Sequence, residues 1–357
     1  MHSATLLPTA HRFEALDALR GFASLAIVLF HLHSYRGGYL AVDFFLVLSG
    51  FVLSHSFLYA ATRKTRRQFI AQRIARLYPL HLFTLVLFIA ATWFTQTKLP
   101  AYRDAPIPVL VQHLTLSHNI GLTPLGATYN YPSWSISVEF WIGVLFCLLA
   151  RRTTDWRLLL LLGSAGLGII GLYTGHLDTY RVNYGSVVNS GLLRGASSFL
   201  LGMVVYRIHR MHHMHRKTPI IRLGWNWLEL GSLAAVAAVV ALRSRHTSPT
   251  DFLAPYLFMV VVFVFAQESG RLSRLLIRCK QLGTISYSTY LNHIPVMMVV
   301  LHATHYTQQS SPMRWLIDGA YLLLLITFSA LTYRFIEQPS GQLMRVAQRY
   351  LPKLVGR

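Results

Sequence analysis

Ten apolar stretches, separated by basic segments, constrain the fold of this chain more than any other feature. Several approach the ~20 residues with which an α-helix crosses a bilayer core. Hydrophobic residues make up 54% of the chain and charged residues 13%, against about 25% charged residues in soluble domains. We therefore expect an all-α, polytopic membrane protein with about ten transmembrane helices. The stretches cover approximately residues 15–34, 40–59, 77–95, 132–150, 158–174, 191–208, 226–243, 252–267, 284–302 and 315–336.

The loops between these stretches differ sharply in charge. With ten spans, 22 of the Lys and Arg residues fall in the loops and C-terminal tail of one side and seven in the loops of the other. Because loops rich in Lys and Arg stay in the cytoplasm, this asymmetry predicts that both termini are cytoplasmic. It also accounts for the formal net charge of +21 without a nucleic-acid partner.

Nothing in the composition divides the chain into separate domains. We expect one transmembrane domain over residues 1–357, with a helical core of about 15–339 and a basic tail, 340–357. Cys147 and Cys279 form no disulfide or zinc pattern. The histidine tract 209–215 lies in a basic loop without a nearby carboxylate, so no metal site is expected.

Polar residues inside the apolar stretches are the candidates for function. Arg20 and His31 are eleven positions apart in the first stretch, which places them on one helix face, roughly 16 Å apart along the axis. Asp43 and Glu139 lie in the second and fourth stretches. Ionisable groups at this depth cost several kcal/mol and usually have a partner or a function. Snorkelling, for Arg20, and structural pairing, for Glu139, are the alternatives.

Two arginines precede the third stretch. Arg73 and Arg76 are three positions apart, so they share a helix face. One interpretation is that they belong to a basic cytoplasmic loop, as the positive-inside rule expects. The other is that they form a clamp for phosphate, whose oxygens match the forked donors of Arg. Glu337 and Arg334, also three apart, are expected to form an ion pair at the inner interface. His293 is a further candidate within the ninth stretch.

Seven motifs, taken in order, resemble those of the acyltransferase-3 family of bacterial membrane proteins, which O-acylate sugars and other exported molecules. One departure is Ala41, where the family more often has glycine. The chain resembles the stand-alone members, which lack a C-terminal hydrolase-like domain. The motifs are Arg20-x10-His31, Asp43-Phe-Phe-x-Val-Leu-Ser49-Gly50-Phe51, Arg73-x-x-Arg76-Leu-Tyr-Pro79, Ser133-Trp134-Ser-x-Ser137-x-Glu139, Arg194-x4-Phe199-x2-Gly202, Ile285-Ser286-Tyr287-Ser288-x-Tyr290-Leu-x-His293 and Arg334-Phe-Ile-Glu337-x-Pro339.

The resemblance implies a membrane O-acyltransferase that takes an acyl group, most simply acetyl, from cytoplasmic acyl-CoA. Arg73 and Arg76 would bind the phosphates of the donor, and Arg20 would lie further along its path. His31 would act as general base or carry the acyl group transiently. Asp43 or Glu139 would orient His31. Ser137 and Tyr290 would donate hydrogen bonds to the oxyanion. The supporting residues would be Ser49, Trp134, Arg194 and His293.

The implied acceptor is a hydroxyl of a cell-surface or exported glycan or glycolipid, reached from the bacterial inner (plasma) membrane. Glycan-synthesis or export machinery is a candidate partner, besides the lipid bilayer itself. A proton-coupled transporter or flippase would use the same buried polar residues and is the main alternative. A non-catalytic sensor, or an enzyme acting on an antibiotic, lipid or peptide, are others.

Overall fold

The computed structural model describes residues 12–33, 37–59, 65–97, 106–122, 128–150, 155–184, 188–214, 222–241 and 248–343. Most of the predicted basic tail, 340–357, therefore lies outside the described residues. The longer helices are α1 (Glu14–His33), α2 (Ala41–Leu53), α3 (Arg66–Gln96), α5 (Trp134–Leu149), α6 (Trp156–Thr174), α7 (Ser190–Met214), α8 (Arg222–Ala241), α9 (Leu253–Phe265), α12 (Ser286–Ala303) and α13 (Ser311–Thr332).

Shorter elements connect these helices. One antiparallel pair of strands, β1 (Asn183–Tyr184) and β2 (Val188–Asn189), precedes α7. The short helices are η1 (Gly38–Leu40), α4 (Pro106–Leu114), η3 (Tyr131–Ser133), η4 (Pro249–Phe252), α10 (Arg271–Leu276), η5 (Ile277–Cys279), α11 (Lys280–Thr284) and η6 (Tyr306–Gln308), with π-helical turns η2 (Ser54–Leu58) and η7 (Tyr333–Glu337).

Each of the ten predicted stretches falls on one of the ten longer helices, so the all-α prediction is confirmed. Within the described residues, seven helical stretches are long and apolar enough to cross a membrane. The other three predicted spans are α9, which is only 13 residues long, and α7 and α12, which bury polar side chains such as Arg194 and His293. The number of crossings and the side of the termini stay predictions.

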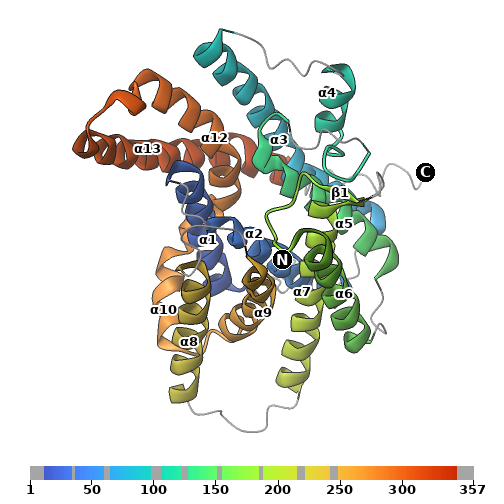
Figure 1. Ribbon diagram of the computed structural model, residues 1–357. Coiled ribbons are helices and arrows are strands. Elements are labelled where there is room, and N and C mark those ends of the chain that lie inside the picture. Colours follow the sequence, from blue (N-terminus) through green and yellow to red (C-terminus); the bar gives the residue numbers. More distant parts are fainter. Residues whose placement is uncertain are drawn as a thin grey trace, which may run out of the picture.

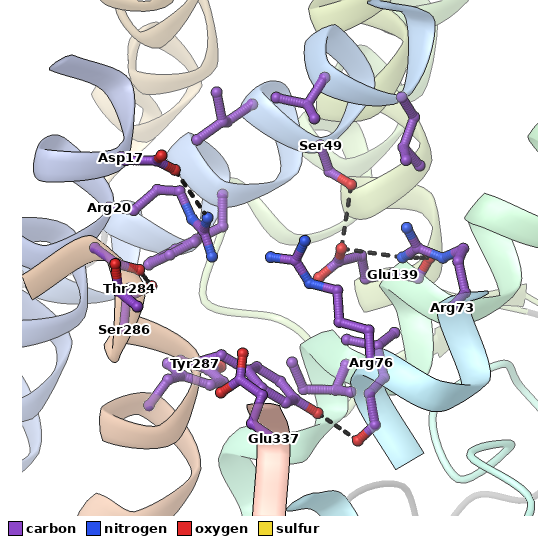
Figure 2. A pocket seen from close by; sticks show the side chains of 18 of the residues that line it. Asp17, Arg20, Ser49, Arg73, Arg76, Glu139, Thr284, Ser286, Tyr287 and Glu337 are labelled. Atoms are coloured by element: carbon purple, nitrogen blue, oxygen red, sulfur yellow. Dashed lines mark hydrogen bonds and ion pairs between the residues drawn. The ribbon is translucent and has the colours of Figure 1, made fainter. Parts of the chain in front are cut away.

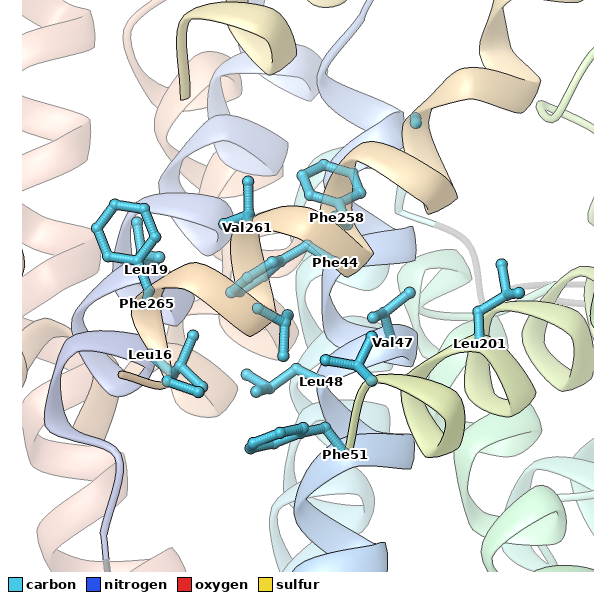
Figure 3. Packing of buried hydrophobic residues seen from close by; sticks show 14 of the residues in the cluster. Leu16, Leu19, Phe44, Val47, Leu48, Phe51, Leu201, Phe258, Val261 and Phe265 are labelled. Atoms are coloured by element: carbon cyan, nitrogen blue, oxygen red, sulfur yellow. The ribbon is translucent and has the colours of Figure 1, made fainter. Parts of the chain in front are cut away.

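The helices form a bundle around α1, α2 and α7, with α12 and α13 on one side and α6 on the other (Figure 1). The packing between α1, α2, α7 and α9 is apolar and closely interleaved (Figure 3). Phe44 and Phe258 meet edge to face with ring centroids 5.7 Å apart. Because the apolar faces of these helices pack against one another, the polar residues of the same helices face other parts of the bundle.

Glycines let α2 and α7 touch backbone to backbone. A Cβ atom at Gly202 would overlap the carbonyl oxygen of Val47, and one at Gly50 would overlap that of Phe199. This reciprocal contact is typical of membrane helices that associate through small residues. It brings Asp43 on α2 within reach of α7, on which the site depends.

We expect Gly202→Ala to lower the stability of the protein by about 1–3 kcal/mol, because the added methyl group forces the two backbones apart. Gly168→Ala on α6 is the matched control, since a Cβ there meets nothing within 4 Å. Thermal unfolding in detergent measures both. Equal melting temperatures for the two variants would contradict the proposed role of the contact.

Candidate active site

A cavity of about 790 Å³ opens between α1, α2, α3, α5, α12 and η7 (Figure 2). It lies at the end of the bundle where α1 and α3 begin, next to the basic segments predicted to be cytoplasmic. Four arginines and three carboxylates line it: Arg12, Arg20, Arg73 and Arg76, with Asp17, Glu139 and Glu337. The excess positive charge suits an anionic ligand.

Arg73 is committed to the protein itself. Its Nη2 atom donates to the side chain of Glu139 at 3.0 Å and to the Glu139 carbonyl at 3.1 Å. Ser49 Oγ donates to the same carboxylate at 3.2 Å. Gly143 makes room, since a Cβ there would lie 2.6 Å from Arg73 Nε. Arg73 thus holds Glu139 and joins α3 to α5, while it also lines the cavity beside Arg76. Phosphate binding by the two arginines stays a prediction.

Arg20 and Arg76 extend their guanidinium groups into the cavity (Figure 2). Arg20 is held loosely by Asp17, with Nη1 and Oδ1 3.3 Å apart. Asp17 also accepts from Arg12 Nε at 2.5 Å, and this bond raises the pKa of the Arg12 guanidinium. Among the described residues, Arg76 has no hydrogen bond or ion pair. These two arginines thus keep donors for a ligand.

Glu337 also faces the cavity (Figure 2). The sequence alone predicts that it pairs with Arg334 instead. Its Oε2 atom accepts from Ser288 Oγ at 3.0 Å, whereas the Arg334 guanidinium lies 5.8 Å from the centroid of the Phe335 ring. The π-helical turn η7 explains the difference, because one wider turn changes the direction in which its side chains point. The expected Arg334–Glu337 pair is therefore wrong.

A small hollow adjoins the cavity and contains His31. It has a volume of about 30 Å³, roughly the room that one water molecule needs. Its walls come from α1, α2, α5, α7, α12 and the connecting segments that contain Tyr39, Tyr131 and Asp178. Arg20 lines the cavity and His31 the hollow, so the two residues of the first motif serve different spaces. The lining includes Phe30, His31, Tyr39, Tyr131, Trp134, Asp178, Tyr180, Arg194 and Tyr290.

His293, and neither predicted carboxylate, is the hydrogen-bond partner of His31. His31 Nδ1 lies 3.0 Å from His293 Nε2 and 3.0 Å from the Ile27 carbonyl. His293 Nδ1 lies 2.5 Å from the carbonyl of Tyr290. Asp43 and Glu139 bind arginines instead, because each carboxylate has a cation on a helix packed directly against its own. The expectation that one of them orients His31 is therefore corrected.

These partners determine where the protons lie. A carbonyl only accepts, so His293 Nδ1 carries a proton and, in the neutral ring, Nε2 has the lone pair. His31 Nδ1 then faces two acceptors and carries a proton as well. Nε2 of His31 is left with a lone pair and, within the described residues, has no hydrogen-bond partner. This is the tautomer that a general base requires.

Arg194 and Asp43 form a buried ion pair behind the hollow. Arg194 Nη2 lies 2.6 Å from Asp43 Oδ2 and Nε 3.1 Å from Oδ1. The remaining donors bind the carbonyls of Leu177, at 2.8 Å, and Tyr39, at 3.1 Å. Ser198 completes the shell of the carboxylate at 2.9 Å. Both charges are thus fully paired, and Asp43 has a structural partner.

Asp251 binds the same two connecting segments, those of Tyr39 and Leu177. Its Oδ2 atom accepts from the Tyr39 hydroxyl at 2.6 Å and from the Leu177 amide at 3.0 Å. Tyr39 and Leu177 therefore accept hydrogen bonds from Arg194 through their carbonyls and donate hydrogen bonds to Asp251. Asp251 and Asp178 were missed by the sequence analysis, because both lie in connections between spans and no motif contains them.

Ser137 and Trp134 have structural positions. Ser137 Oγ donates to the Leu116 carbonyl at 2.6 Å and accepts from the Asn119 amide at 3.2 Å. Ser137 lines neither the cavity nor the hollow, so the prediction that it is an oxyanion donor is corrected. The Trp134 ring stacks on Tyr180 with centroids 5.1 Å apart and forms part of the hollow.

Among the described residues, no three His, Cys, Asp or Glu side chains gather as metal ligands.

Comparison with known proteins decides the family. The acyltransferase-3 profile, described as "Acyltransferase domain", matches residues 13–334. The chain belongs to the acyltransferase-3 family. This membership establishes an acyltransferase and agrees with the apolar helices of a membrane protein. No solved structure matches the chain significantly.

Three relatives illustrate the similarity. The chain is 26% identical to the "putative membrane-bound transacylase BcsY" of Komagataeibacter xylinus, over 92% of this acyltransferase and 83% of the relative. It is 26% identical to "O-acetyltransferase OatA" of Staphylococcus aureus over its whole length, which spans 60% of that relative. It is 24% identical to "peptidoglycan O-acetyltransferase OatA" of Listeria monocytogenes over 91% of the chain and 55% of the relative.

We expect Asp43→Ala to destabilise this acyltransferase by about 3–5 kcal/mol, because it leaves Arg194 charged, buried and unpaired. The control is Lys280→Ala, which removes an ion pair with Glu14 whose side chains are 45% and 35% exposed. Such exposed pairs contribute about 0–1 kcal/mol. Thermal unfolding in detergent compares them, and a melting temperature of Asp43→Ala equal to that of the control would show that the buried pair is dispensable.

Proposed function

We propose that this acyltransferase transfers an acetyl or similar acyl group from cytoplasmic acyl-CoA to a hydroxyl of a cell-surface or exported glycan, within the bacterial plasma membrane. The observation that carries the proposal is the adjacency of two spaces. Among the described residues, a cavity whose arginines keep unused donors meets a hollow that contains a histidine with an unpaired ring nitrogen. The proposed domain is the whole chain, working as one membrane unit.

The cavity would hold the charged part of the donor. Arg76 and Arg20 offer forked donors that match phosphate oxygens, and the net positive charge of the lining favours a polyanion. Arg73 supports this arrangement indirectly, because it neutralises Glu139, which would otherwise repel phosphate. The cavity volume of about 790 Å³ is within the range of pockets for ligands of drug or cofactor size.

His31 would act as the base. Its Nε2 atom takes the proton from the acceptor hydroxyl as the hydroxyl oxygen attacks the thioester carbonyl. The carbon–sulfur bond then breaks, the acyl group stays on the acceptor oxygen, and the departing sulfur takes up the proton. His293 fills the orienting position that a carboxylate has in hydrolytic triads, since it accepts the Nδ1 proton of His31.

The hollow supports a hydroxyl acceptor. Asp178 is the carboxylate in its lining, and Tyr131 and Tyr180 add aromatic surface with hydroxyl groups. A few polar groups on an aromatic wall are typical of sites that orient a small ligand group. The glycan class is proposed from this lining and from the names of the relatives, one of which is a peptidoglycan O-acetyltransferase.

The function is tested with purified protein in lipid nanodiscs, labelled acetyl-CoA and a panel of glycan acceptors. We expect acyl transfer, and a loss of about 10²–10⁴-fold in kcat for His31→Ala, which is the usual contribution of a general base. His33→Ala is the matched control, because His33 binds Asp318 at 3.0 Å and lines neither space. Transfer by His31→Ala at the parent rate would overturn the assignment, and glycan movement without acylation would favour the transporter.

Arg76 and Arg73 are expected to separate donor binding from stability. We expect Arg76→Ala to raise the KM for acetyl-CoA about tenfold or more, which is the effect of losing one charge-assisted hydrogen bond, with an unchanged melting temperature. Arg73→Ala should lower the melting temperature, because Glu139 then loses its partner. Steady-state kinetics and thermal unfolding test both variants, and equal effects on KM and stability would contradict the division of roles.

A further inference from the structure

The cavity and the His31 hollow meet at two residues. Val42 and Tyr290 each line both spaces. Tyr290 is the larger of the two and is 6% exposed. Its ring centroid lies 6.1 Å from that of Phe45, which lines the cavity, and 5.9 Å from that of His293, the partner of His31. The ring therefore lies where the cavity that contains the arginines meets the hollow that contains the proposed base.

Hydrogen bonds hold this ring in place. The Tyr290 hydroxyl donates to the Pro132 carbonyl at 2.8 Å and lies 2.8 Å from Ser135 Oγ. Pro132 lines the hollow and Ser135 lines the cavity. The hydroxyl is thus hydrogen-bonded to residues at the start of α5, which lie at the boundary between the cavity and the hollow.

The backbone of this turn of α12 is supported from outside the helix. Pro295 has no N–H to donate to the Leu291 carbonyl four residues earlier, and Asn130 Nδ2 donates to that carbonyl instead, at 2.8 Å. The Tyr290 carbonyl accepts from the His293 ring. A movement of this turn would therefore also move the imidazole that orients His31.

We propose that Tyr290 is the barrier between the donor cavity and the His31 hollow, and that the acyl end of the donor reaches His31 only when this ring turns away. The proposal rests on the proposed function for the passage of the acyl group, whereas the barrier itself requires no donor. It assigns Tyr290 a positioning role, in place of the predicted oxyanion donor, because both bonds of its hydroxyl are already used. A sealed boundary would also keep water in the hollow from hydrolysing the thioester.

The barrier is tested by thiol labelling across it. Cys147 and Cys279, the two cysteines of the chain, are replaced by alanine, and Ile27→Cys places one thiol in the hollow. The reagent is a negatively charged, membrane-impermeant methanethiosulfonate, added to inside-out vesicles so that it arrives from the cavity side. Mass spectrometry measures the labelled fraction of the thiol with time.

We expect Tyr290→Ala to increase the labelling rate at least about tenfold, because thiol reactivity requires access, and Tyr290→Phe to stay within about twofold of the parent, since it keeps the ring. Labelling from the opposite side of the membrane should not change. If Tyr290→Ala does not accumulate in the membrane, Tyr290→Leu takes its place. Fast labelling of the parent, or slow labelling of a folded Tyr290→Ala protein, would overturn the barrier.

Acceptor-free hydrolysis of acetyl-CoA gives a second readout. We expect it to rise in Tyr290→Ala and to stay at the parent level in Tyr290→Phe, since water then reaches the thioester carbonyl and displaces the thiol. Labelling needs neither donor nor activity, so a failed barrier is distinguishable from a failed acyltransferase. Increased labelling without acetyl-CoA hydrolysis in the parent or any variant would support the barrier and contradict the donor.

Discussion

The buried ion pair between Arg194 and Asp43 is the interaction on which the rest of this structure depends. Its side chains are 1% and 0% exposed, and charges so buried are tolerated only when every donor and acceptor has a partner. The carbonyls of Tyr39 and Leu177 complete the shell of Arg194. One guanidinium thereby joins α2, α7 and two connecting segments, and it forms part of the wall of the hollow that contains His31.

The site divides its polar groups between two environments. The arginines line an open cavity, where water and a charged ligand offset the cost of their charge. His31 lines a hollow with room for about one water molecule, and its Nδ1 atom is hydrogen-bonded to the ring of His293. The arginines that keep donors for a ligand thus lie at one end of the site and the proposed base at the other, with Val42 and Tyr290 lining both spaces. This separation matches a donor that is anionic at one end and reactive at the other.

The helices could be predicted from the sequence, whereas the hydrogen-bond and ion-pair partners of the site residues could not. Each of the ten apolar stretches became a helix, because burial of apolar side chains follows directly from composition and length. The motif residues Arg20, Arg76, His31 and Tyr290 all line the cavity or the hollow. The partner of His31 was missed, because His293 lies 262 positions away and no periodicity within one helix reports on packing between helices. Asp178 had no signal at all, since it lies in a connection between spans.

By itself, the sequence determined that this chain is a helical membrane protein, which side of it is basic, and that costly polar residues recur in the motifs of one family. Those properties are local, because they depend on the type and spacing of neighbouring residues. The tertiary structure alone decided which charge meets which: Arg194 with Asp43, Arg73 with Glu139, and His31 with His293. Pairing between helices depends on their relative rotation and depth, which packing sets; for Arg194 and Asp43 it does so through the contact of Gly50 and Gly202 with the opposing backbones.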